Sequence, residues 1–202
     1  MPTYPLSFPT DLGPISDTFK PVSQGVSHRG IYTGITSVQS TDGSYWERQL
    51  TFTPMLRDNA EKLLSFLLRL QGQVGTFKCG VFGGRSSRGR PTGVVNLASF
   101  STFDSTMTIT DAKANNSKFL IAGDWFEING SLFKCLEDVR TNSLGGATFE
   151  VFPRPVSLRC SAGQVLIFNN PQGEWRLAAT PEWTVDQLRR VGISIAMTEA
   201  IL

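Results

Sequence analysis

The sequence predicts a mainly β protein, an antiparallel β-barrel or sandwich with one flanking α-helix. Two observations predict this class. About ten short apolar or alternating segments follow one another at regular spacing, which is typical of such folds. The 19 glycines and 11 prolines stand largely in the turn-like stretches between these segments. With 202 residues, the chain can bury a sizeable core without a disulfide or a metal.

Domain boundaries follow from the distribution of proline. Residues 1–25 contain five prolines, which interrupt any regular ladder or helix, so this segment is expected to form an extended, proline-rich arm. Residues 26–202 are expected to form a single β-rich domain. Within that domain, residues from about 94 to 178 could form a second β subdomain.

The domain begins with two candidate strands. Residues 31–38 are expected to form a short strand, and the dipeptide Asp42-Gly43 is typical of a hairpin turn. Residues 45–53 alternate between apolar and polar side chains, which predicts a half-buried strand. Arg48 interrupts the apolar face of that strand.

One amphipathic helix is expected over about residues 57–71. Its apolar residues recur every three or four positions, which gives the helix one strongly apolar face. They are Leu56, Ala60, Leu63, Leu64, Leu67 and Leu70. Asp58 and Glu61 have the spacing of a capping box, and Gly72 is a suitable residue to end the helix.

Everything after Gly72 is expected to be β structure. The dipeptide Asn129-Gly130 lies between two apolar runs and is a strong hairpin signal. The candidate strands are residues 74–82, 94–99, 107–110, 119–128, 132–139, 147–152, 165–168, 175–178 and 191–199.

Composition excludes several function classes. The single histidine, His28, and three widely spaced cysteines do not provide the ligand cluster of a zinc site, and we expect no cofactor. No apolar run is long enough to span a bilayer, and the first residues lack the pattern of a signal peptide. Charged residues are only 18% of the chain, below the roughly 25% of an average protein, which favours extensive interfaces.

An arginine-rich loop is the densest polar segment. Residues 83–93 contain Arg85, Arg88 and Arg90 among glycines and serines. Glycine-exposed amides and arginines could hold a phosphate, although the segment does not match a P-loop. The other interpretations are a mobile surface loop, or a loop that faces a channel or a partner subunit.

Carboxylates and tryptophans are the remaining candidates for chemistry. Asp124 and Glu127, like Glu137 and Asp138, would face opposite sides of a regular strand, although pairing across the hairpin could bring Asp124 near Asp138. We expect no catalytic residue among them. The four tryptophans could form a sugar-stacking platform or fill the core and interfaces. They are Trp46, Trp125, Trp175 and Trp183.

A series of motifs resembles a known family. The strand at residues 45–52 is followed by the leucine-rich helix and then by residues 70–77, which have the form L-x-G-x-x-G-T-F. Residues 120–130 contain a GD-x-F-x-I hairpin, and residues 146–155 contain a strand of the form A-T-x-x-x-x-P. The strand motif Trp175-Arg176-Leu177 follows. In this order, the motifs resemble distal tail and minor tail-tip proteins of long-tailed bacteriophages.

The resemblance implies a tail-tube-like fold and a structural role in the virion, without enzymatic activity. About six copies would form a ring at the tail tip, a closed heterologous assembly. Its expected partners are the tail tube, the hub and fibres, and the tape measure protein, after assembly in the bacterial host cytoplasm. DNA would only pass through the lumen, and the net charge of +2 favours weak or absent binding.

Two other function classes stay open at this point. The chain could be a carbohydrate- or protein-binding β-sandwich module that uses exposed tryptophans, or a hydrolase that uses paired carboxylates.

Overall fold

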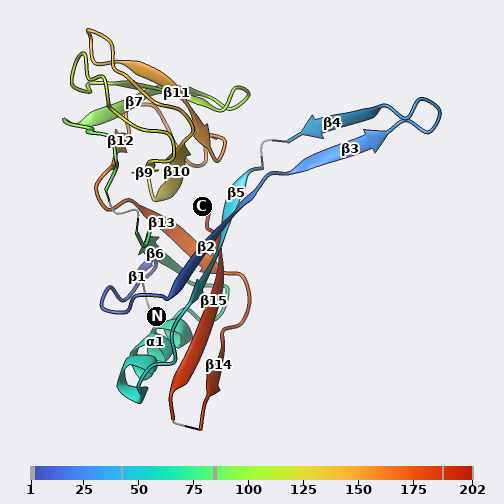
Figure 1. Ribbon diagram of the computed structural model, residues 1–202, viewed down its shortest axis with the longest axis vertical. Coiled ribbons are helices and arrows are strands. Elements are labelled where there is room, and N and C mark those ends of the chain that lie inside the picture. Colours follow the sequence, from blue (N-terminus) through green and yellow to red (C-terminus); the bar gives the residue numbers. More distant parts are fainter. Residues whose placement is uncertain (1–2, 42, 84–85, 188, 202) are drawn as a thin grey trace.

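The computed structural model describes residues 3–41, 43–83, 86–187 and 189–201. The protein is mainly β, with 43% of residues in strands and 7% in helix, which confirms the predicted class. The strands form two sheets and a separate two-stranded hairpin (Figure 1).

The first sheet has seven strands and packs against the helix. Phe66 of the helix contacts Phe77 of the sheet edge-on, with ring centroids 5.5 Å apart, and both side chains are buried. The strand order is β1 (Leu6–Ser7), β6 (Thr76–Gly80), β13 (Gln172–Leu177), β15 (Val191–Glu199), β5 (Tyr45–Thr51) and β2 (Ser16–Val22), with β14 (Glu182–Val185) also paired to β15.

The helix α1 (Arg57–Arg69) confirms the predicted apolar face from Ala60 onward. Leu56 was expected on that face but is 71% exposed, and the predicted cap is absent. The N-cap residue of the helix is Leu56, and no side chain caps that end. Asp58 lies inside the first turn instead, where its negative charge favours the positive end of the helix dipole. After the helix, Gly72 adopts a φ of 70°, as expected for a residue that ends a helix.

The second sheet is a nearly closed barrel with its own core. Its strand order is β12 (Val165–Leu166), β7 (Val95–Ser101), β8 (Thr106–Thr110), β11 (Ala147–Phe152), β10 (Ser131–Cys135) and β9 (Trp125–Ile128). A bridge between Glu127 and Ile167 joins its two ends. Asn129 and Gly130 have φ values of 49° and 77°, which confirms the predicted hairpin turn between β9 and β10.

The barrel lies in the chain between two neighbouring strands of the first sheet. The chain leaves the first sheet after Gly80 of β6 and returns at Gln172 of β13, and these two residues are partners in the ladder. The second sheet therefore covers β7 to β12, and β13 belongs to the first sheet although the sequence placed it in the second subdomain.

Direct contacts join the two sheets. The indole Nε1 of Trp46 donates to the carbonyl of Leu132 at 3.2 Å, and the N–H of Glu174 donates to the carbonyl of Gly130 at 2.7 Å. Trp125 packs against Trp46, with ring centroids 5.0 Å apart. The interface is therefore both apolar and hydrogen-bonded.

The N-terminal segment is extended as predicted, but it pairs in the first sheet, although its prolines were expected to interrupt a regular ladder. β2 pairs with β5 over seven residues, and β1 pairs in parallel with β6. Pro21 is accommodated within β2 because this strand lies at the edge of the sheet and needs a partner on one side only.

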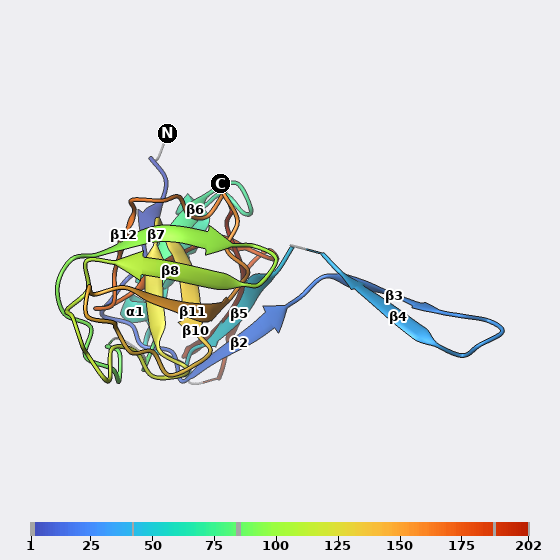
Figure 2. The same cartoon turned by 90° about the horizontal axis from the view of Figure 1, so that it is seen from above.

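A long hairpin projects from the molecule (Figures 1 and 2). It consists of β3 (Gly25–Arg29) and β4 (Thr36–Ser40), which continue outward from β2 and β5. Residues 31–35, expected in a strand, form its tip. The hairpin turn expected at Asp42-Gly43 is wrong, because the strand after it, β5, pairs with β2 and β15 and not with β4. Asp42 itself lies outside the described residues.

Candidate assembly surfaces

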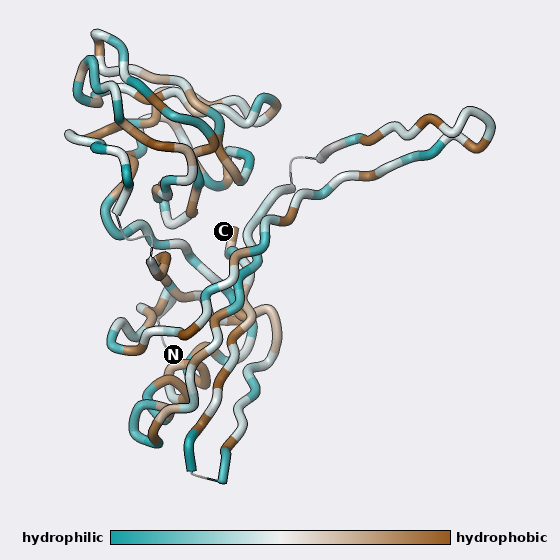
Figure 3. Tube along the Cα trace, in the orientation of Figure 1, coloured by the Kyte–Doolittle hydropathy of each residue, from teal (hydrophilic) through white to brown (hydrophobic). Residues whose placement is uncertain are grey.

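The projecting hairpin is exposed on both faces. The side chains of Ile31 and Tyr32 at its tip are 94% and 100% exposed, and Val26, Ile35 and Val38 are also exposed. Figure 3 shows several hydrophobic positions along this hairpin, which extends away from the rest of the chain. A two-stranded hairpin is marginal in water, and exposed apolar groups of this kind mark interaction sites.

Charge is also unevenly distributed along the hairpin. Residues 23–41 include His28 and Arg29 but no aspartate or glutamate. Its tip is ordered by backbone hydrogen bonds, since the N–H of Gly30 donates to the carbonyl of Ile35 at 2.9 Å. The hairpin is thus an apolar, weakly basic arm. The absence of acids over 19 residues was the sequence signal that could have revealed it.

A pocket lies beside the opposite edge of the first sheet. Its volume is about 490 Å³, and we call it the edge pocket. It is lined by residues 7–10, residues 78–82, Asn169, Asn170 and Gln172. Phe8, Pro9, Val81 and Phe82 supply apolar walls, whereas the three amide side chains are polar. No motif in the sequence indicated this pocket, because it is formed by three separate segments.

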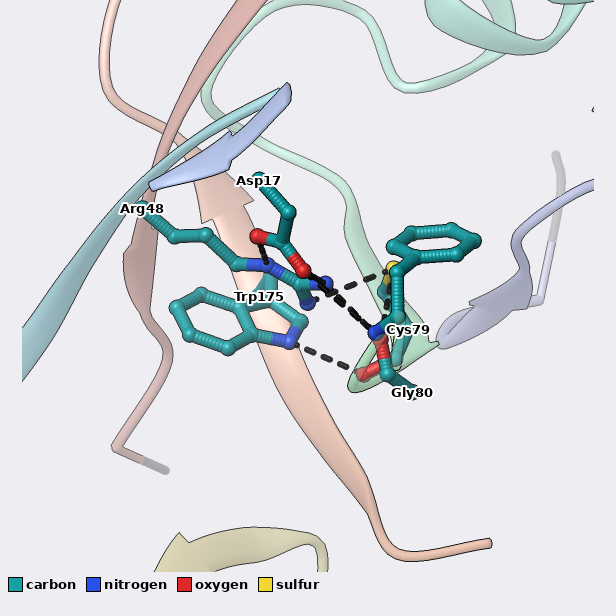
Figure 4. A network of polar contacts seen from close by, with 6 residues as sticks. Asp17, Arg48, Cys79, Gly80 and Trp175 are labelled. Atoms are coloured by element: carbon teal, nitrogen blue, oxygen red, sulfur yellow. Dashed lines mark hydrogen bonds and ion pairs between the residues drawn. The ribbon is translucent and has the colours of Figure 1, made fainter. Parts of the chain in front are cut away.

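A buried arginine fixes the wall of the edge pocket (Figure 4). The side chain of Arg48 is 0% exposed, and its Nε and Nη2 atoms each donate to a carboxylate oxygen of Asp17 at 2.8 Å. Nη2 also donates to the carbonyl of Gly80 at 2.8 Å. Asp17 in turn accepts the N–H of Phe82 at 3.3 Å.

Aromatic rings surround the same guanidinium group. It lies 4.5 Å from the ring centroid of Phe19 and 5.2 Å from that of Trp175. The arginine that interrupts the apolar face of β5 is therefore fully partnered, and it connects β2, β5 and the end of β6.

The arginine loop is fastened to the barrel. The backbone N–H groups of Arg88 and Gly89 each donate to the carboxylate of Asp124 at 2.9 Å. The side chains of Arg88 and Arg90 are exposed, whereas Arg85 lies outside the described residues. The described part of the loop is thus a fixed surface with outward arginines, and no helix follows it to complete a phosphate site.

The same end of the barrel carries further basic residues. The N–H of Arg90 donates to the carbonyl of Lys118, and the hydroxyl of Thr141 donates to the carbonyl of Lys113. These contacts hold three loops together, and their exposed side chains include Arg90, Lys113 and Lys118.

The candidate carboxylates bind backbone groups. Asp124 also accepts the N–H of Ile121 at 3.0 Å, and Asp138 accepts the neighbouring N–H of Ala122 at 2.9 Å. Pairing across the hairpin does bring Asp124 and Asp138 to one turn, but there they hold the backbone. Burial raises the pKa of Asp124, yet hydrogen bonds from the backbone outweigh it, so that the pKa is lowered overall.

The other two carboxylates are also occupied. Glu127 accepts the N–H of Gln172 at 2.7 Å, and its pKa is raised because it is buried. Glu137 accepts the N–H of Glu150 at 3.0 Å. Among the described residues, the four candidate acids share no hydrogen-bond partner that would make them act as a pair.

The tryptophans do not form one platform. Trp46 and Trp175 are buried, and Trp125 packs against Phe19 with centroids 4.9 Å apart. Trp183 is 46% exposed on β14. Three of the four therefore serve packing.

The described part of the chain brings together no group of three His, Cys, Asp or Glu residues suited to a metal. It also has no helix long and apolar enough to cross a membrane. Burial raises the pKa of Cys79, Cys135 and Cys160 to about 11.

The sequence matches no protein-family model, and comparison with curated proteins finds no match.

Proposed function

We propose that this chain is a structural subunit of a phage tail. About six copies would form a closed ring at the distal end, through heterologous contacts. The ring would join the tail tube to the hub and fibres, receive the tape measure protein, and enclose the path of the DNA. The proposal rests on the motif resemblance together with the hairpin, which exposes Ile31 and Tyr32.

The hairpin carries this proposal because it contributes nothing to the core of its own chain. From Gly25 to Gln39 every residue is exposed, so the ordering of this segment is not offset by burial within the subunit. In a ring, a neighbour covers the apolar side chains and the loss of conformational entropy is offset on assembly.

Other features support an assembly role. The candidate acids are engaged in backbone hydrogen bonds, as Asp124 and Glu127 show, which disfavours the hydrolase interpretation. Most tryptophans serve packing, which weakens the case for a sugar-stacking platform. The modest net charge of +2 suits a ring through which DNA slides.

The proposal is tested by replacing residues 25–40 with Asn-Gly. The ends join well, because the N–H of Thr41 already donates to the carbonyl of Gln24 at 3.0 Å. We expect the intact chain to form rings in negative-stain images at high protein concentration. The shortened chain should stay monomeric in size-exclusion chromatography with light scattering, at an unchanged urea midpoint.

A monomeric intact chain that binds glycans on an array, and loses this binding in Trp183→Ala, would replace the proposal with the carbohydrate-binding one.

A further inference from the structure

The hairpin and the edge pocket lie at opposite edges of the same sheet. The hairpin extends β2 and β5, and β2 is the last strand in the order. The edge pocket is lined by the residues of β6 and the segment after β1, at the first strands in the order. Figure 2 shows the hairpin pointing away from the body of the chain.

We propose that the hairpin tip of one copy inserts Tyr32 into the edge pocket of the next copy. This inference rests on the proposed ring, and it assigns the two surfaces that make it. A projecting element and a separate recess on one chain form a heterologous contact, which closes into a ring when the rotation between copies allows it.

The chemistry of the two surfaces is complementary. Tyr32 is 100% exposed and has an aromatic body with a polar end. In the edge pocket, Phe8 and Phe82 can pack against its ring, and the amide of Asn169 or Asn170 can bind its hydroxyl. A volume of about 490 Å³ holds one such side chain together with part of Ile31.

Charge does not decide this pairing. The hairpin carries Arg29 and no acid. Lys78 lines the edge pocket, and Asp11, which follows the pocket-lining Thr10 in the chain, is 60% exposed and lies 3.4 Å from Lys62. The pairing therefore rests on the aromatic and amide contacts available to Tyr32.

The hairpin cannot reach the pocket of its own chain. Its base is fixed by the seven-residue pairing of β2 with β5, and the pairing of β3 with β4 stiffens the arm itself. The arm points away from the body of its own chain, and so away from the edge pocket (Figure 2). The occupant is therefore a second copy of this chain.

The buried Arg48 network has a role in this arrangement. It holds the carbonyl of Gly80 and, through Asp17, the N–H of Phe82, so the pocket wall is preformed before a hairpin arrives. A preformed recess lowers the entropic penalty of association.

The test places one cysteine on each surface, as Thr33→Cys beside Tyr32 and Thr10→Cys in the pocket lining. Both positions are exposed in the subunit, so the variants should fold. The three native cysteines are buried with pKa values of about 11, so they should not react under mild oxidation near neutral pH. The full chain is oxidised and separated on a non-reducing gel.

We expect a ladder of disulfide-linked oligomers in the double variant only. Each single variant should stay monomeric on the gel, and an equimolar mixture of the two should give dimers and nothing larger. Adding Tyr32→Ser to the double variant should remove at least nine-tenths of the ladder. The matched control, Gln39→Ser on the exposed face of β4, should leave the ladder intact.

Each other outcome is decisive. Rings in negative-stain images without a ladder would overturn the hairpin-to-pocket assignment and leave the proposed ring standing. Neither rings nor a ladder would overturn both. Efficient dimerisation of Thr33→Cys alone would indicate that two hairpin tips meet, which contradicts a heterologous contact.

Discussion

Asp124 binds three backbone N–H groups, those of Arg88, Gly89 and Ile121, and thereby fastens the arginine loop to the turn before β9. Only a carboxylate offers acceptors to all three donors without bringing a donor of its own. The lowered pKa of this group means that the folded state favours its charged form. This residue therefore couples loop structure to pH.

We predict that Asp124→Asn lowers the free energy of unfolding at pH 7 by about 2–3 kcal/mol, the contribution of hydrogen bonds to a charged group. A lowered folded-state pKa gives stability that is present above the unfolded pKa of about 4 and is lost as the pH falls through the folded value. The difference between variant and natural chain should shrink below about pH 4 in urea titrations.

The control for this prediction is Asp104→Asn. Asp104 is an exposed acid of the same barrel, and an amide oxygen can still accept its hydrogen bond from Ser101. This variant should change stability by less than about 0.5 kcal/mol. An equal loss in both variants would contradict the role assigned to Asp124.

At the scale of elements, α1 is held by packing. Leu63 is 0% exposed against the first sheet, whereas Leu68 on the same helix is 65% exposed. We predict that Leu63→Ala lowers the free energy of unfolding by about 2–5 kcal/mol, because it leaves a cavity in the core. Leu68→Ala should change it by less than about 0.5 kcal/mol. Urea denaturation followed by tryptophan fluorescence measures both, and similar losses would show that the helix is not packed as described.

Elements with strong local signals were predictable from the sequence. The alternation at residues 45–53, the leucine periodicity of α1 and the dipeptide Asn129-Gly130 each correspond to an observed element. Their signals are local, since propensity, periodicity and turn chemistry act over a few residues.

Elements with distant partners, or with no buried face, were missed. β2 contains Pro21 and alternates weakly, and it is a strand only because β5 offers a ladder along one side. The hairpin of β3 and β4 lacks a buried face, so it has no apolar alternation to detect. The edge pocket combines segments more than 60 residues apart in sequence, which no local pattern can indicate.

At the scale of the whole molecule, a buried ion pair joins Arg159, in the segment between β11 and β12 of the barrel, to Glu199 of β15 in the first sheet. The Nη1 atom of Arg159 donates to both carboxylate oxygens of Glu199 at 2.9 Å, and Nη2 donates to the carbonyl of Ser44 at 2.7 Å. Both side chains are 1% exposed. Removal of one partner leaves an uncompensated buried charge.

We predict that Arg159→Met lowers the free energy of unfolding by about 3–5 kcal/mol. The matched control, Arg57→Met, removes an exposed pair with Glu61 on α1 and should change it by less than about 0.5 kcal/mol. Both are measured by urea denaturation. Two separate unfolding transitions in the natural chain would contradict a coupled molecule.

A second property of the whole molecule is its affinity for DNA, which depends on net charge and on how that charge is distributed. The net charge is +2, although Arg90, Lys113 and Lys118 gather at one end of the barrel. We predict weak, salt-sensitive binding, with a Kd above about 1 μM at physiological salt. A gel-shift assay with duplex DNA tests this, and a nanomolar Kd would be incompatible with a ring that lets DNA slide.

The barrel enters and leaves the first sheet through a single ladder pair, Gly80 and Gln172. A tight turn could bridge these two positions, so the first sheet's topology is complete without the intervening segment. The segment between Gly80 and Gln172 is therefore an insertion in the first sheet, and another domain could be inserted at the same two positions. Such an exchange would keep the strands of the first sheet and the projecting hairpin, but it would replace Val81, Phe82, Asn169 and Asn170 of the edge pocket and so change what that pocket can bind.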